Sequence, residues 1–466
     1  MMTRSLKLGT SVLVAALLSG AAFAESYGPY PITEKSYSGD KTNSVAYTGQ
    51  VARNIMIDSL KKLAGQADGG ANAEELKDTM MLYFARGNKE DLAIVSHKGK
   101  DGFPITQTML NEISSGANLV GKTYGGLVPG WPGNKTGAEV VEHMIHHAAM
   151  SEGGVSNDLG YDWGQLIQKF LIGAVSYNQA VDNYLDEKMT ADNKPNNKPY
   201  SDGAAYTGKE HSWDEAFGYF GAPAHALDLS AGDAYGISKK TAFDAGDANG
   251  DGTIDLKSEM TFGNAYYAAD ADKSGTDYLQ TITAAFIEGR KVITAADGEA
   301  LSEAELAQVQ AYAATIEDEM TRVLAEATFK YAGSVYGDIE KIRADKNNIS
   351  DELYRDYIKH WGELKGFAMA LQTGRENLGG TAVRLNRLIG YGPPTKDESV
   401  VTGIDADGNF VKDGKMSWNA YQLNMLKVQD LLIKEFGVEA RKNDGTENLA
   451  NLIKVLDSDS GGAETD

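Results

Sequence analysis

The sequence predicts an all-α protein built from two related helical bundles with long loops and an inserted EF-hand-like calcium loop. Hydrophobic residues recur at helical spacing along most of the chain, capping signals precede several of these stretches, and strand signals are few. The chain has 466 residues and no cysteine. A chain of this length is expected to build its core without disulfides.

Residues 1–24 predict a cleaved secretory signal peptide. The segment combines a basic start at Arg4 and Lys7, a short apolar run at 8–18 and a small-x-small cleavage site ending at Ala24. The run is too short to cross a membrane, and no other long apolar run follows it. We therefore expect cleavage after Ala24, no transmembrane segment, and a bacterial envelope protein that is periplasmic or secreted.

Helical patterning begins near Ser44 and continues to Leu63. Thr136, Thr207 and Ser302 each precede a glutamate by three residues, which is the spacing of a capping box at a helix start. The same periodicity predicts further helices at about 73–85, 105–115, 136–150, 162–188, 207–220, 278–292, 302–343, 350–374, 378–390, 416–436 and 445–456.

The best of the few strand signals predicts a small hairpin at 400–410, with its turn at Asp407-Gly408. The loops at 190–206 and 221–277 are rich in Asp, Asn, Gly and Pro, and loops of this length are usually functional or ion-stabilised. We divide the chain after the signal peptide into a first helical bundle at 25–230, a calcium-loop insertion at 231–277 and a second helical bundle at 278–466.

The formal net charge of −22 argues against nucleic acid and anionic membrane surfaces as partners. It favours solubility and cation binding. A solvated acidic surface is the alternative explanation for most of this charge. No nucleophile elbow, phosphate-cradling loop or dinucleotide fingerprint is present.

Residues 247–255 match the first nine positions of an EF-hand-type calcium loop. Oxygen-bearing side chains stand at positions 1, 3, 5 and 9, a glycine at 6 and a backbone carbonyl is expected at 7. Position 12 is Ser258 and the acid comes one residue late, so we expect a variant geometry or a ligand from elsewhere around a structural calcium ion. The predicted ligands are Asp247, Asn249, Asp251, Thr253, Asp255 and Glu259.

A solvated Asp/Gly turn is the alternative interpretation of this loop. A weaker echo of the pattern follows at 270–276, where Asp277 stands at the position that usually holds an apolar residue. It predicts, at most, a partial second calcium site.

Three helical clusters contain five of the seven histidines. His211 and Glu215 are four residues apart, a spacing that allows a shared metal or a hydrogen bond. His360 and Glu363 form a possible ligand or proton-transfer pair. The alternatives are a solvated polar face for the first pair and a satisfied core histidine for the second.

The third cluster comprises His143, His146 and His147 on the predicted helix at 136–150. Their spacings of three and four residues suit chelation, so metal or haem binding is one interpretation and a solvated helix face is the other. No His-Glu-x-x-His motif is present in the chain.

Four segments, at 44–53, 209–219, 285–290 and 360–367, together resemble one family. The most specific of them is His-Ser-Trp-Asp-Glu-Ala-Phe-Gly-Tyr at 211–219. On these residues the chain is identified as a member of an uncharacterised family of bacterial envelope proteins, domain-of-unknown-function family 4856, which is similar to the imelysin-like superfamily. This resemblance implies two related helical bundles and a link to iron or metal handling in the periplasm.

Imelysins carry a Gly-x-His-x-x-Glu motif that has been associated with metallopeptidase activity. His360 and Glu363 match its last part, but Ile358 stands where the motif has glycine. At the other matching segment, His211 is followed three residues later by Asp214, and Lys209 replaces the glycine.

The sequence therefore predicts non-catalytic binding of a metal, haem or metal-bearing ligand in the cell envelope. His360, Glu363, His211 and Glu215 are the predicted inter-bundle site. Histidine and glutamate ligands suit iron or zinc, whereas the Asp/Asn loop suits calcium. One alternative is a metallopeptidase with His360 as ligand and Glu363 as ligand or general base. The other is a calcium-dependent scaffold or interaction protein without a transition metal.

Overall fold

Helices make up most of the structure, which confirms the predicted all-α class. The computed structural model describes residues 25–87 and 90–460, so the predicted signal peptide lies outside the described residues. The first five helices are α1 (Thr48–Ala64), α2 (Ala73–Phe84), α3 (Gly137–Met150), α4 (Trp163–Leu171) and α5 (Gly208–Phe220).

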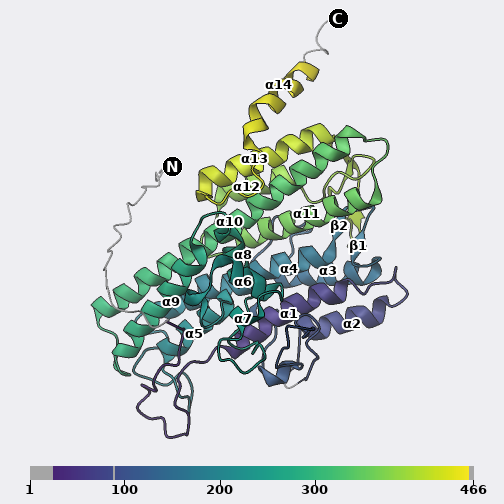
Figure 1. Cartoon of the computed structure of the whole chain (residues 1–466). Coiled ribbons are helices and arrows are strands. Elements are labelled where there is room, and N and C mark those ends of the chain that lie inside the picture. Colours follow the sequence, from purple (N-terminus) through teal and green to yellow (C-terminus); the bar gives the residue numbers. More distant parts are fainter. Residues whose placement is uncertain (1–24, 88–89, 461–466) are drawn as a thin grey trace, which may run out of the picture.

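Three shorter helices, α6 (Ala231–Ser238), α7 (Phe243–Gly246) and α8 (Gly263–Asp272), lie within the segment predicted as a long loop. The remaining helices are α9 (Tyr278–Ala295), α10 (Glu303–Ala344), α11 (Asp351–Ala370), α12 (Gly379–Ile389), α13 (Trp418–Phe436) and α14 (Leu449–Ser460). Figure 1 shows α10 and α11 running through the middle of the body, and α14 projecting beyond the other helices.

The strands are two residues long and pair in three antiparallel ladders. The pairs are β1 (Val155–Ser156) with β2 (Tyr161–Asp162), β3 (Ser399–Val400) with β6 (Gly414–Lys415), and β4 (Gly403–Ile404) with β5 (Phe410–Val411). The last pair confirms the predicted hairpin. Gly408 in its turn has a φ of 86°, a conformation that glycine adopts without strain.

Local capping explains several helix starts. The predicted capping boxes at Thr136, Thr207 and Ser302 are all present, immediately before the first residues of α3, α5 and α10. At α5, the Thr207 hydroxyl accepts a hydrogen bond from the Glu210 amide, and the Glu210 carboxylate accepts one from the Thr207 amide. Each box satisfies backbone donors that a helix start would otherwise leave unpaired.

Two predicted helices differ from the structure. The helix predicted at 105–115 is reduced to a 3₁₀ turn at Leu110–Glu112, because Ile105 forms a parallel β-bridge with Ile254 and so is held extended. The helix predicted at 162–188 begins as α4 and continues in π-helical form at Ile172–Tyr177 and Gln179–Tyr184.

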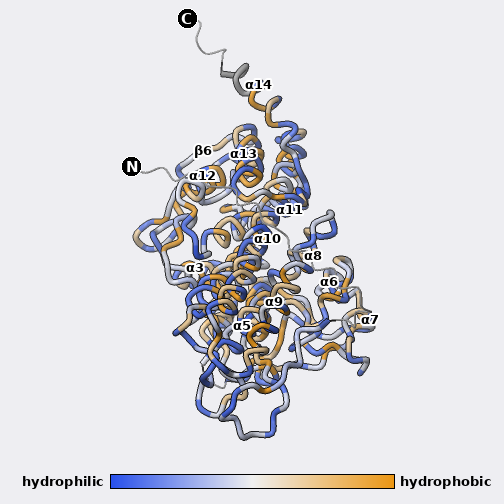
Figure 2. The backbone as a smooth tube through the Cα atoms, turned by 90° about the vertical axis from the view of Figure 1, so that its left-hand side faces the viewer, coloured by the Kyte–Doolittle hydropathy of each residue, from blue (hydrophilic) through white to orange (hydrophobic). Residues whose placement is uncertain are grey.

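One hydrophobic cluster runs through the body, from Tyr27 to Val438. α10 contacts α8, α9, α11 and α13, while α4 contacts both α1 and α11. Figure 2 shows apolar stretches distributed along the packed helices, with α6 and α7 at one edge of the body. Helices of both predicted bundles thus share one core. The boundaries at 230 and 277 stay predictions, as does the division into two related bundles.

No helix among residues 25–87 and 90–460 has both the length and the apolar character needed to span a bilayer.

Candidate functional site

A cavity of about 730 Å³ opens where six helices meet. Its walls come from α1, α4, α6, α8, α10 and α11, together with short segments near Ser96, Lys240 and Asn443. Both His360 and Glu363 of the predicted site line it. The cavity therefore lies between helices of the two predicted bundles and the predicted insertion.

His360 is oriented by a neighbouring carboxylate. Its Nδ1 atom lies 2.6 Å from Oδ2 of Asp338 on α10, and Asp338 is buried. The imidazole donates from Nδ1 to this carboxylate, which fixes the ring orientation and leaves Nε2 as the available acceptor.

Glu363 lies one turn further along α11 and faces α4. Its Oε1 atom is 3.8 Å from Nζ of Lys169, and both side chains are buried. Gly366 allows this approach, because a Cβ at that position would lie 2.5 Å from Cβ of Lys169. Burial, and then the Glu363 charge, raise the pKa of the nearby Tyr331 phenol far above its ordinary value. Glu363 is therefore part of a buried polar cluster on the cavity wall.

The cavity also contains a histidine outside the three sequence clusters. His97 is buried, and its Nε2 lies 3.5 Å from Oδ2 of Asp58. Burial lowers the pKa of His97 to about 4, despite the opposing effect of the Asp58 carboxylate. Sequence reasoning missed this residue because its only local signal was a lone histidine after Ser96.

Lysine is the most frequent residue on the cavity wall, a feature that sequence reasoning also missed. The wall contains seven lysines but only two carboxylates, those of Asp58 and Glu363. The lysines are contributed by α1, α4, α10, α11 and the end of α6, and they are Lys61, Lys62, Lys169, Lys239, Lys240, Lys330 and Lys359. Nothing in their sequence spacing connects them, since they meet only in the fold.

His211 and Glu215 do not line this cavity. They lie on α5, with His211 Nε2 at 3.7 Å from Glu215 Oε2. The His211 ring stacks on Tyr206 with centroids 4.3 Å apart, and Glu215 Oε1 accepts a hydrogen bond of 2.6 Å from Gln50. Burial lowers the pKa of His211. The four residues predicted as one inter-bundle site thus occur as two separate pairs, of which His360 and Glu363 belong to the cavity.

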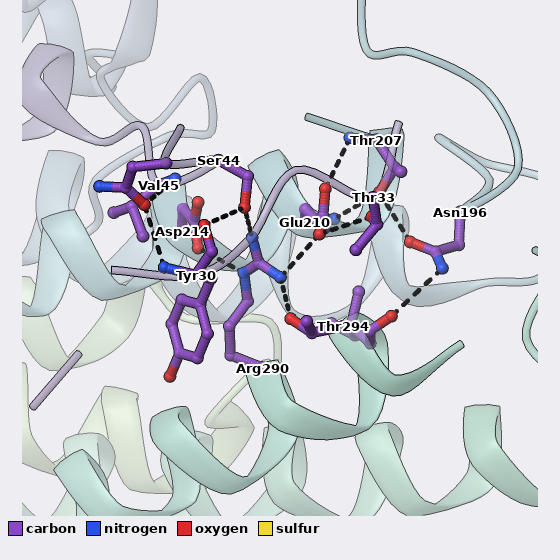
Figure 3. A network of polar contacts seen from close by, with 12 residues as sticks. Tyr30, Thr33, Ser44, Val45, Asn196, Thr207, Glu210, Asp214, Arg290 and Thr294 are labelled. Carbon is purple, nitrogen blue, oxygen red and sulfur yellow. Dashed lines mark hydrogen bonds and ion pairs between the residues drawn. The ribbon is translucent and has the colours of Figure 1, made fainter. Parts of the chain in front are cut away.

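The segment around His211 contacts Arg290 of α9 through two buried carboxylates. Figure 3 shows the guanidinium of this α9 residue between Asp214 and Glu210, with Ser44 and Thr294 beside it. Arg290 lies 2.9 Å from each carboxylate and 2.7 Å from Oγ of Ser44. Three of the four segments that carry the family resemblance therefore meet at one fully buried ion network.

The loop at 247–259 folds back on itself. Asp247 accepts hydrogen bonds from the amides of Asp251 and Gly252, and Asn249 accepts one from Asp251. The carboxylate of Glu259, which follows position 12 of the loop pattern, accepts hydrogen bonds from the amides of Asn249 and Asp255 at 3.3 and 2.7 Å. Asp247, Asn249 and Glu259 thus accept hydrogen bonds from backbone amides of the loop itself.

Glu259 is buried, and burial raises the pKa of its carboxyl. The nearby Asp247 and Asp255 charges raise it further, against hydrogen bonds that lower it. This residue would relieve its repulsion by binding a cation. The loop is also anchored to the rest of the protein, since Gln107 donates to Asp255 at 2.8 Å and accepts from the Leu256 amide at 2.9 Å.

The echo at 270–276 has a different geometry. Asp270 lies in α8, where Lys330, Lys442 and Lys273 approach its carboxylate to 2.8, 2.7 and 3.7 Å. Asp272 accepts hydrogen bonds from the amides of Tyr278 and Leu279 at the start of α9. Both side chains already have partners that an ion would have to displace.

The histidines of α3 join this helix to the β-hairpin. His143 donates from Nε2 to the Gly408 carbonyl at 2.9 Å and accepts from Trp131 at Nδ1. The His147 ring stacks on Trp163, and burial lowers the pKa of His147 to about 4. His146 is exposed. These contacts favour a packing role for His143 and His147.

In the described parts of the chain, no group of three or more His, Cys, Asp or Glu side chains is placed to hold a metal ion. Residues 150–357 match a family model described as "Domain of unknown function (DUF4856)". The matched range includes Glu210, Asp214 and Arg290 and the loop at 247–259, but not Ser44, and it ends just before His360. No curated protein matches the chain, and no solved structure does.

Proposed function

For this chain, whose residues 150–357 belong to the domain-of-unknown-function family DUF4856, we propose a non-catalytic binding function in the cell envelope. The bound molecule is a metal-bearing ligand, such as a metal chelate or haem, held in the cavity that His360 and Glu363 line. The observation that carries this proposal is the contact of 2.6 Å between Nδ1 of His360 and Asp338.

A histidine that donates from one ring nitrogen to a carboxylate presents the other nitrogen as a metal ligand. Metal-binding histidines almost always have such a partner, which fixes their tautomer and raises their basicity. Glu363 adds an oxygen ligand one turn away on the same helix, and imidazole with carboxylate suits iron or zinc. His360 and Glu363 supply two protein ligands, so the bound molecule itself would complete the coordination.

The cavity size favours a metal-bearing molecule over a bare ion. Its volume of about 730 Å³ falls within the range of about 300–1,000 Å³ that small-molecule sites occupy. The other histidine and carboxylate of the wall, His97 and Asp58, already pair with each other. A bare ion would leave most of the space to water.

Export and calcium stabilisation complete the proposal. Residues 1–24 support export. The oxygen donors at 247–259 support a structural calcium ion held by Asp247, Asn249, Asp251, Thr253, Asp255 and Glu259. The imelysin-like relationship belongs to the same proposal, since it links helical bundles with metal handling.

The metallopeptidase alternative, with His360 as ligand and Glu363 as ligand or general base, needs a third protein ligand beside an open metal position. It predicts cleavage of a test protein. The scaffold alternative predicts that His360→Ala disturbs only local packing while calcium removal melts the fold.

Elemental analysis of the untagged mature protein, purified from the periplasm without chelator, tests the proposal. We expect iron or zinc near one per chain in addition to calcium. His360→Ala should abolish the transition metal, and Asp338→Asn should lower metal affinity by about 10–100-fold. His146→Ala is the matched control, because it removes an exposed imidazole outside the cavity. Calcium alone in the wild-type protein would contradict the proposal.

A further inference from the structure

The charge of the cavity wall is opposite to that of the whole chain. The chain has 66 acidic and 44 basic residues, whereas the wall has seven lysines and two carboxylates. Like charges gathered around one space repel one another, and they raise the local concentration of anions. The wall therefore has the electrostatics of an anion site within an acidic protein.

Most of these lysines have no carboxylate partner. Lys169 pairs with Glu363 at 3.8 Å, and Lys330 pairs with Asp270 at 2.8 Å. Among residues 25–87 and 90–460, the other five form no ion pair within 4.0 Å, and these are Lys61, Lys62, Lys239, Lys240 and Lys359. Their charges are available to a bound molecule.

The side-chain amines of Lys61 and Lys169 lie close together on the inner wall of the cavity, where both contact Gln168. Both donate a hydrogen bond to Oε1 of Gln168, Lys61 at 2.9 Å. Gln168 is turned this way because its amide nitrogen donates to Asp58. Two cations thus share one neutral oxygen, with Glu363 as the nearest opposite charge for Lys169. An oxyanion placed here would receive two charge-assisted hydrogen bonds.

We propose that the ligand of this cavity carries two or more carboxylate or phosphate groups. Lys61 and Lys169 receive one group at the inner wall, and Lys62 and Lys239 receive another at the rim, where both are exposed. This inference rests on the proposed function and specifies its ligand class, since an anionic chelator would present its metal to His360 while its acidic groups meet the lysines.

Isothermal titration calorimetry on the full mature protein tests the inference with four probes. Citrate represents ligands with several carboxylate groups, and inorganic pyrophosphate represents ligands with several phosphate groups. Glucose is a neutral probe of comparable size, and zinc chloride supplies a bare cation. We expect citrate or pyrophosphate to bind, with affinity that falls as salt is raised, and glucose not to bind.

The double variant Lys62→Gln/Lys239→Gln should weaken anion binding by about tenfold or more, because it removes two charged donors. Both positions are exposed, so the variant is expected to fold. Lys415→Gln/Lys434→Gln is the charge-matched control, with side chains exposed by 67% and 66% outside the cavity. Lys169→Met tests whether the inner wall contributes to anion binding. If this buried substitution prevents folding, the exposed double variant Lys62→Gln/Lys239→Gln still tests the inference.

Two outcomes separate this inference from the proposed function. The anion assignment would be overturned if zinc or glucose bound in the cavity and neither anion did. It would also be overturned if both double variants weakened anion binding equally. Either result would leave a ligand-binding function in place. Absence of binding by all four probes, together with a metal content unaffected by His360→Ala, would overturn both.

Discussion

Arg290 illustrates how a single side chain organises the region around α5. Its guanidinium is fully buried and pairs with two carboxylates, Glu210 and Asp214, at 2.9 Å each. Tyr27 also donates to Asp214, at 2.7 Å. Burial raises the pKa of Asp214, and the Arg290 charge lowers it again. The arginine therefore keeps two desolvated carboxylates compatible with a folded core.

Replacing Arg290 by Met should destabilise the protein by about 3–5 kcal/mol, because it leaves buried carboxylates without a counter-charge. The free energy of unfolding from urea titration measures this effect. Lys434→Met is the control, since it breaks the exposed pair with Asp430 and should cost less than about 1 kcal/mol. Equal decreases in the free energy of unfolding in the two variants would show that the buried Arg290 network contributes no more stability than an exposed ion pair.

Glu259 predicts a pH-dependent response to calcium. Its folded-state pKa is raised, so its charged form costs stability above that pKa, and the calcium-free protein regains this stability as pH falls through it. Calcium needs the charged form. Saturating calcium at about 100 times its dissociation constant should thus stabilise the neutral-pH protein by about 2.7 kcal/mol.

The stabilisation by calcium should decrease as pH is lowered from neutral to below the raised Glu259 pKa. Calorimetric Tm values with and without calcium measure this stabilisation. Glu259→Gln should show a smaller gain with less pH dependence. A calcium effect that is absent at neutral pH in the wild-type protein would contradict the loop assignment.

At the residue scale, the sequence predicted the histidines and acids of the candidate site but not their partners. Four-residue spacing on α5 correctly indicated that His211 and Glu215 approach each other. The separation of that pair from His360 and Glu363 depends on helix packing, which no local spacing specifies. Asp338 and Lys169 are distant in sequence from the residues they orient.

At the element scale, glycines set how closely the helices pack. Gly218 lies where α5 meets α1, and a Cβ there would be 2.7 Å from Cβ of Tyr47. Gly366 plays the same part between α11 and α4. Gly218 therefore allows α5 and α1 to approach closely, and the position of Lys169 beside Glu363 depends on the equivalent contact at Gly366.

Gly366→Ala should destabilise the protein by about 1–3 kcal/mol, because the added methyl group overpacks the contact with Lys169. It should also weaken citrate binding, since α11 and α4 both line the cavity. Gly337→Ala on α10 is the matched control, with no atom within 4 Å of the added Cβ. Better helix propensity should make it more stable by about 1 kcal/mol. Equal effects of the two substitutions on unfolding free energy would contradict the packing argument.

Elements with local signals were predictable, and those set by tertiary contacts were not. The capping boxes identified the starts of α3, α5 and α10 because the signal lies within four residues. The helix predicted at 105–115 was wrong because pairing of Ile105 with Ile254 overrides its periodicity. α6 and α8 were missed because polar and glycine residues dominate the segment around them.

At the scale of the whole molecule, the cavity connects the predicted bundles to the predicted calcium-loop segment. α6 and α8 flank the loop and supply Tyr235, Lys239, Tyr266 and Tyr267 to the cavity wall. The seven lysines come together only when these helices pack against α1, α4, α10 and α11. The sequence therefore predicted the helical class and the histidine–acid pair, whereas the cavity and its charge required the fold.

Calcium removal should affect the cavity as well as the loop. Chelation with EGTA is expected to lower Tm and to weaken citrate binding, because the wall formed by α6 and α8 loses its anchored loop. Hydrogen exchange should show faster exchange over 231–277 than over α10. Unchanged citrate affinity in calcium-free protein would show that the loop and the cavity are energetically independent.

The most direct measurement is an anomalous diffraction experiment on mature protein purified from the periplasm without chelator. We expect a transition-metal peak in the cavity at about 2.0–2.1 Å from Nε2 of His360, with acidic groups of the bound molecule beside Lys61 and Lys169. An anomalous signal confined to the loop at 247–259, with no metal beside His360, would contradict a metal-bearing ligand in this cavity.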